Sequence, residues 1–83
     1  MRVYQYIFVD GDNGSIETIQ GTNLYKVNKN AFDIYNEYAE AFHCNLATDF
    51  FAWCKRFNIH HNGGDSSEYG WFDCKRNDFD VED

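Results

Sequence analysis

The chain has 83 residues, with 14 acidic against seven basic side chains for a formal net charge of −7, and it contains eight Phe, six Tyr and two Trp. This length accommodates a single domain over residues 1–83, and the aromatic side chains supply the apolar volume that so small a core requires. The negative charge repels phosphate backbones and anionic lipids, which argues against direct binding of nucleic acid or of a membrane surface.

The N-terminal residues lack the apolar core and the cleavage site of a signal peptide, and no segment approaches the roughly 18 apolar residues of a membrane span. We therefore expect a cytoplasmic protein. Its three cysteines are an odd number without close pairing. In a reducing compartment they are expected to be free thiols that fill small apolar spaces.

Residues 3–9 predict an inner β-strand, because both of its alternating faces are mostly apolar. One face carries Tyr4, Tyr6 and Phe8, and the other carries Val3, Ile7 and Val9. Turn-forming residues follow at 10–14, and residues 15–20 return to a strand-like composition, so this part of the chain predicts a hairpin. A further short strand is expected through Leu24, Tyr25 and Val27.

Two amphipathic helices are predicted next. The first runs from Ala31 to about His43 with Asn28 or Asn30 as its cap, because its apolar residues fall on one half of the helical wheel. The second begins near Thr48, with a carboxylate in its first turn and two basic residues in its last, which suits the helix dipole. Its buried stripe is expected to comprise Phe50, Trp53, Cys54 and Phe57.

The remaining residues predict one strand starting at 59–61, a loop at 62–67, a final strand at 69–76 and a frayed, flexible acidic tail at 77–83. The fold class is therefore α+β. The order β-β-(β)-α-α-β-β indicates a small antiparallel sheet of three to five strands with two amphipathic helices packed on one face.

Motifs for metal and catalytic chemistry are weak. Residues 10–17 suggest a calcium loop, but the EF-hand register puts no carboxylate at its first, third and twelfth positions. Cysteine and histidine lack the paired spacing of zinc sites, so no metal or other cofactor is predicted, although a small metal-binding domain stays open as an alternative. The residues considered for such a site are His43, Cys44, Cys54, His60, His61 and Cys74.

A catalytic cysteine would need a histidine base and an electropositive setting. Cys54, beside Lys55 and Arg56, is the best placed of the three, but it lies in the apolar stripe of the second helix. We therefore expect a protein that is not an enzyme.

The carboxylates of the first helix form a more informative pattern. Asp33, Glu37 and Glu40 follow the spacing i, i+4, i+7, so they lie along one stripe, and no Lys or Arg occurs between Ala31 and Phe50. Like charges at this spacing each cost a few tenths of a kcal/mol, so a purely structural helix would gain by alternating signs. The stripe is either a solvated surface that aids solubility or a docking surface for a basic partner.

By its size, its acidity, this stripe and the C-terminal carboxylates at 78, 80, 82 and 83, the chain resembles the small acidic inhibitors made by phages and other mobile elements, including anti-CRISPR and anti-restriction proteins. The resemblance implies action in the host cytosol against a nuclease or another nucleic-acid-handling complex. An anionic stripe beside aromatic rings can imitate nucleic acid, with its dense charge and stacked bases.

The sequence therefore predicts a non-enzymatic inhibitor that docks an acidic surface on the basic, nucleic-acid-binding site of a host protein such as a CRISPR effector or nuclease. An assembly module that homodimerises through aromatic surface is the alternative of a different class. The residues expected to contact the partner are Asp33, Tyr35, Glu37, Tyr38, Glu40, Tyr69, Trp71, Asp73, Asp78 and Asp80.

Overall fold

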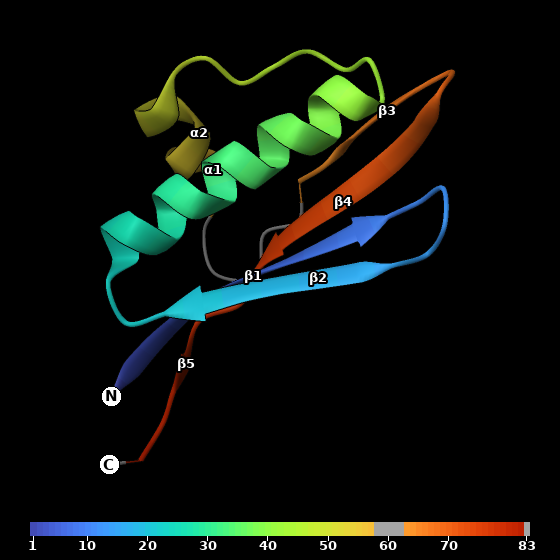
Figure 1. The fold of residues 1–83 in the computed structure, drawn as a ribbon. Helices are drawn as coiled ribbons and strands as arrows, with labels where there is room; N and C mark the ends of the chain where they lie inside the picture. The colour runs from blue at the N-terminus through green and yellow to red at the C-terminus, as the bar shows by residue number, and fades with distance from the viewer. Residues whose placement is uncertain (58–62, 83) are drawn as a thin grey trace.

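A computed structural model describes residues 1–57 and 63–82 and shows an antiparallel sheet with two helices on one of its faces (Figure 1). This arrangement confirms the predicted α+β class. The elements in chain order are β1 (Arg2–Asp10), β2 (Ile16–Gly21), α1 (Leu24–Ala41), α2 (Phe50–Arg56), β3 (Asp65–Ser67), β4 (Gly70–Arg76) and β5 (Phe79–Asp80).

The strands follow the order β2-β1-β4-β3, and β5 pairs with the N-terminal end of β1. The predicted inner strand is therefore β1, which has β2 on one side and β4 on the other. The predicted hairpin joins β1 to β2. In its turn, Asp10 Oδ1 accepts a hydrogen bond of 2.8 Å from the N–H of Asp12, and Gly14 adopts a φ of 75°, which glycine tolerates best.

The core lies between the sheet and the helices. Tyr6 and Phe8 of β1 face the helices, as do Phe72 and Cys74 of β4, and all four are buried. Helix α2 contributes Trp53, with Phe57 just after its end, and α1 adds several smaller residues along one stripe. Ring-to-ring packing across these elements supplies the apolar burial that stabilises a chain of this length.

Helix α1 begins seven residues before the predicted start, so the expected strand through Leu24, Tyr25 and Val27 is wrong. Asn23 caps the helix, and its Oδ1 accepts a hydrogen bond of 3.1 Å from the N–H of Lys26. The predicted caps Asn28 and Asn30 instead lie inside the helix. Asn28 is buried and accepts a hydrogen bond of 2.8 Å from the hydroxyl of Tyr6, a long-range contact that local sequence does not encode.

Helix α2 matches the predicted second helix, although Asp49 is its N-cap and precedes the first turn. The carboxylate of Asp49 accepts a hydrogen bond of 3.1 Å from the N–H of Ala52. In the predicted stripe, Trp53 and Phe57 are buried, whereas Phe50 and Cys54 are half-buried.

The C-terminal third differs from prediction in two places. Residues 65–67, expected in a loop, form the edge strand β3 and pair with β4. Residues 79–80, expected to fray, form β5 and pair with Arg2 and Val3 of β1. The predicted final strand is β4, and the strand expected at 59–61 lies outside the described residues.

A buried ion pair holds this C-terminal segment in place. The Asp78 side chain is only 2% exposed, and its two carboxylate oxygens accept hydrogen bonds of 2.9 and 2.7 Å from Nε and Nη2 of Arg76. The same guanidinium donates to the carbonyl of Phe57 at 3.1 Å. Two parallel charged hydrogen bonds fix the direction of the chain after β4 and bring β5 alongside β1.

We expect Asp78→Ala to lower the free energy of unfolding by about 3 kcal/mol, because it leaves a buried guanidinium without its partner. Asp80→Ala is the matched control, since Asp80 is exposed and its 3.2 Å pair with Arg2 is expected to contribute less than about 1 kcal/mol. Urea unfolding of the two variants measures the difference. An equal decrease in the free energy of unfolding for the two variants would show that the ion pair between Asp78 and Arg76 does not anchor the C-terminal segment.

Burial raises the pKa of Tyr6 above its ordinary value. Because the unfolded chain then loses this proton more readily than the folded chain, ionisation favours unfolding, and stability falls as pH rises beyond about 10. In Tyr6→Phe this alkaline loss should be shallower, although the variant is less stable at neutral pH by about 1 kcal/mol because Asn28 loses its donor. Chemical denaturation at a series of alkaline pH values measures both effects, and an unchanged alkaline slope would contradict the first.

Candidate partner-binding surface

Carboxylates from four separate segments meet at one end of the molecule, where the C-terminal half of α1 lies beside the β1–β2 hairpin and the β3–β4 turn (Figure 1). No Lys or Arg occurs in residues 3–25, 30–54 or 57–74, so this end contains no cation of its own among the described residues. We call it the acidic end and define it by Asp10, Asp12, Glu17, Glu37, Glu40, Asp65 and Glu68.

Three contacts bring these segments together. The Tyr38 hydroxyl donates to Glu17 Oε1 at 3.3 Å, which joins α1 to β2. The Ser67 hydroxyl donates to the carbonyl of Phe42, and the ring of His43 stacks on Tyr69 with 4.2 Å between centroids. The last two contacts join the end of α1 to the β3–β4 turn. The segments of the acidic end are therefore held together by specific contacts within the fold.

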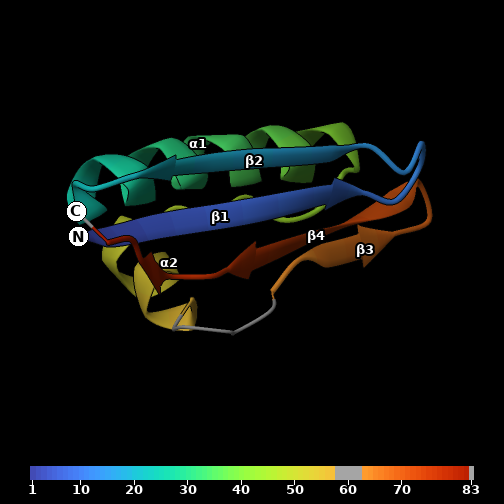
Figure 2. The ribbon, with the colours of Figure 1, turned by 90° about the horizontal axis from the view of Figure 1, so that it is seen from below.

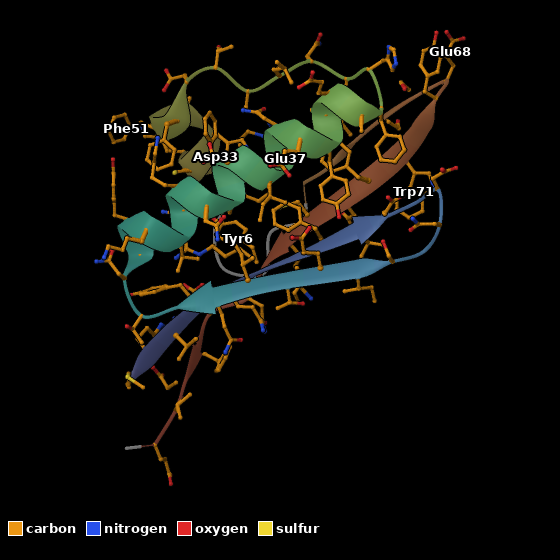
Figure 3. The ribbon with its side chains drawn as sticks, viewed as in Figure 1. Tyr6, Asp33, Glu37, Phe51, Glu68 and Trp71 are labelled. Atoms are coloured by element: carbon orange, nitrogen blue, oxygen red, sulfur yellow. The ribbon has the colours of Figure 1, made fainter. Side chains whose placement is uncertain are left out.

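The predicted carboxylate stripe is exposed along α1. Asp33 and Glu37 are exposed on successive turns of the helix (Figure 3), and Glu40, which is also exposed, continues the same stripe. None of the three forms an ion pair within the described residues. The helix has no acidic residue in its first turn and no basic residue in its last, so Lys26 near its start and Glu40 near its end both oppose the helix dipole.

A shallow hollow of about 240 Å³ lies between α1 and the hairpin. Tyr38 forms its aromatic wall, with its ring stacked between Phe8 and Phe72 at centroid distances of 5.7 and 5.5 Å. Burial raises the pKa of Tyr38, and the negative charge of Glu17 raises it further, so the hydroxyl stays protonated. The lining residues are Asp10, Glu17, Glu37, Tyr38, Ala41 and Phe42.

The hollow has the composition of a receptor for a cationic side chain, because the carboxylates of Asp10, Glu17 and Glu37 attract the positive charge. Asp10 and Glu17 are not among the contact residues predicted from the sequence. Their positions follow from strand alternation, which places them on the same face of the hairpin as Phe8, and from the register that pairs Glu17 with Phe8.

Two exposed aromatic residues flank the acidic end. Tyr69 is 58% exposed in the β3–β4 turn, and Trp71 is 49% exposed at the start of β4 (Figure 3). Trp71 lies so close over Gly11 that a Cβ there would approach the indole ring to 2.2 Å. The glycine thus sets the position of the indole, and both rings are available to a partner.

Two of the predicted contact residues are not available. Tyr35 is 2% exposed and packs edge-on against Phe72, with 5.1 Å between centroids, so it belongs to the core. Its place in the apolar half of the helical wheel already indicated burial. Asp78 is buried and neutralised by Arg76, as described above.

The other C-terminal carboxylates do not join the α1 stripe. Asp80 is exposed but pairs with Arg2, at the end of the molecule opposite the hairpin (Figure 1). Asp73 is half-buried on β4, and its Oδ1 accepts a hydrogen bond of 2.9 Å from the N–H of Cys74. The predicted contact residues therefore do not form one continuous surface. Only those at the acidic end lack neighbouring cations.

The cysteines are free thiols, with Cys74 buried and Cys44 and Cys54 half-buried. Burial raises the pKa of all three, which keeps them protonated and disfavours thiolate chemistry. The described residues contain no group of three or more His, Cys, Asp and Glu side chains placed to hold a metal ion. His60 and His61 lie outside the described residues.

Comparisons with protein-family models, with curated proteins and with solved structures find no match to this chain. Neither described helix is long and apolar enough to cross a bilayer.

We expect Glu40→Lys to raise the free energy of unfolding by about 0.5 kcal/mol, because it removes a like-charge neighbour of Glu37 and places a cation at the C-terminal end of the helix. Glu82→Lys is the control with the same change in charge, far from α1. Thermal and urea denaturation at low salt measure the difference. A destabilised Glu40→Lys protein would show that the carboxylate has a local structural role.

Proposed function

We propose that the protein is a non-enzymatic inhibitor whose acidic end docks on the basic, nucleic-acid-binding site of a host protein, such as a nuclease or a CRISPR effector. The observation that carries the proposal is the convergence of carboxylates from α1, the hairpin and the β3–β4 region at one end without an intervening cation. Such a surface competes with phosphates for the same Lys and Arg side chains.

The parts of the surface have separate roles in this mechanism. The exposed carboxylates of α1 and the β3–β4 turn attract a basic partner over a distance and set the rate of association. Tyr69 and Trp71 supply apolar contact area, which usually provides most of the binding energy at an interface. The carboxylates that line the hollow beside Tyr38 receive one lysine or arginine of the partner and fix the orientation of the complex.

The charge pattern of α1 supports a functional role. Glu40 opposes the helix dipole, and the carboxylates of the stripe repel one another, so they lower the stability of the isolated protein. A cationic partner would relieve this repulsion upon binding. The proposed inhibitor acts in the cytoplasm, where nucleic-acid-handling complexes are accessible.

The test is capture of partners from bacterial lysate by tagged protein at low and at high salt, with identification by mass spectrometry. We expect a nucleic-acid-binding complex at low salt and its loss at high salt, because exposed charges are screened. Glu40→Gln combined with Glu68→Gln should reduce capture, since it removes two charges from the acidic end. Glu82→Lys changes the net charge equally at the other end and should leave capture intact.

Two results would refute the proposal. Capture that is unaffected by the paired substitutions would remove the acidic end from the interface. Capture that falls equally with Glu82→Lys would indicate a response to net charge and no defined docking surface.

A further inference from the structure

The face of the sheet opposite the helices carries an apolar patch without a cover among the described elements. Figure 2 looks onto this face, with both helices behind the strands. Strand alternation places the odd-numbered residues of β1 and β4 and the even-numbered residues of β2 here. We call this the open face and define it by Gln5, Ile7, Val9, Ile16, Thr18, Gln20, Asp73 and Lys75, with Trp71 at its hairpin edge.

The half of the open face near the hairpin differs in composition from a solvated sheet surface, whereas its other half carries Gln5 and Gln20, which form a hydrogen bond of 3.1 Å with each other. Antiparallel sheets with one covered face usually alternate apolar residues on the inside with polar residues on the outside. Here β1 presents Ile7 and Val9 outward, Ile16 beside them is 68% exposed, and Trp71 extends the patch at the hairpin end. These apolar residues predict an inner strand, yet only one face of β1 is covered by the described elements.

The open face is also electrically neutral in a protein of net charge −7. Its charged side chains are Asp73 and Lys75, two residues apart on β4. A basic partner is attracted to the acidic end and gains nothing electrostatic from a neutral face. A second copy of the chain, which the acidic end repels, meets the least repulsion here.

The pairing register makes the open face self-complementary. Ile7 lies level with Thr18 and Lys75, and Val9 lies level with Ile16 and Asp73. Consider two copies stacked with their open faces together and related by a two-fold axis between the sheets. If this axis runs perpendicular to the strands, midway between the two rows, it exchanges one row with the other. Ile7 then faces Val9 of the second copy, Thr18 faces Ile16, and Lys75 faces Asp73, so each apolar residue meets an apolar or β-branched neighbour and each charge meets its opposite.

We propose that two copies of the chain associate face to face through their open faces, as an isologous homodimer with aligned sheets. The axis stacks β1 on β1 in opposite directions, so the two acidic ends point away from each other. Helix α1 lies on the far side of each sheet and stays exposed. The dimer therefore carries two acidic ends, and its formation does not depend on the function proposed for them.

The test is sedimentation equilibrium of the full chain over a concentration series, combined with a charge swap. We expect the wild-type protein to dimerise, and Asp73→Lys to weaken dimerisation about tenfold or more, because it sets like charges against each other. Lys75→Asp should have the same effect. The double variant with both substitutions has the wild-type composition and should recover the wild-type dissociation constant.

A second variant tests the apolar rows without altering charge. Val9→Thr keeps a β-branched side chain in β1 and should weaken dimerisation while circular dichroism shows a folded monomer. Several results would overturn the proposal: a wild-type protein that stays monomeric throughout the series, a dimer indifferent to Asp73→Lys, or no recovery in the double variant while it remains folded.

Discussion

The side chain of Tyr6 joins the three elements on which the arrangement of the molecule depends. It lies on β1 (Figure 3). Its ring stacks on Trp53 of α2 at 5.7 Å between centroids, and its hydroxyl donates to Asn28 of α1 at 2.8 Å. The hydrogen bond fixes which side of α1 faces the sheet, since a buried hydroxyl and a buried amide satisfy each other only in this rotation. Because the rotation of α1 is fixed, Asp33, Glu37 and Glu40 face solvent.

The amphipathic patterns predicted the core well and the helix start poorly. The period of the apolar residues in α1 identifies its buried stripe, and Ile34 and Ala39 lie where that period places them. The start of α1 depends on which of several asparagines caps the helix and which instead contacts another element of the fold. Asn28 has the chemistry of a cap, but its contact with Tyr6 lies 22 residues away in sequence, and Asn23 takes the capping role. The conformational preferences of the local sequence do not reveal such a long-range contact.

The sequence predicted only part of the candidate site, because burial and strand register decide which carboxylates belong to it. The stripe on α1 follows from helical spacing, and its exposure agrees with that spacing. Asp78 was grouped with it because both are acidic, but the side chain is buried against Arg76, two residues away on the chain. Sequence alone does not distinguish a solvated carboxylate from one that neutralises a guanidinium. Conversely, Glu17 joins the site only through the hairpin register and the hydroxyl of Tyr38.

The two ends of the described chain lie side by side. The amino group of Met1 donates to the carbonyl of Val81 at 2.7 Å, and both lie at the end of the sheet opposite the hairpin (Figure 1). Any additional polypeptide attached at either end would therefore leave the molecule from one place, remote from the acidic end. A short linker between the ends would also close the chain into a ring, and new ends opened in an exposed loop would give a circular permutant of the same fold.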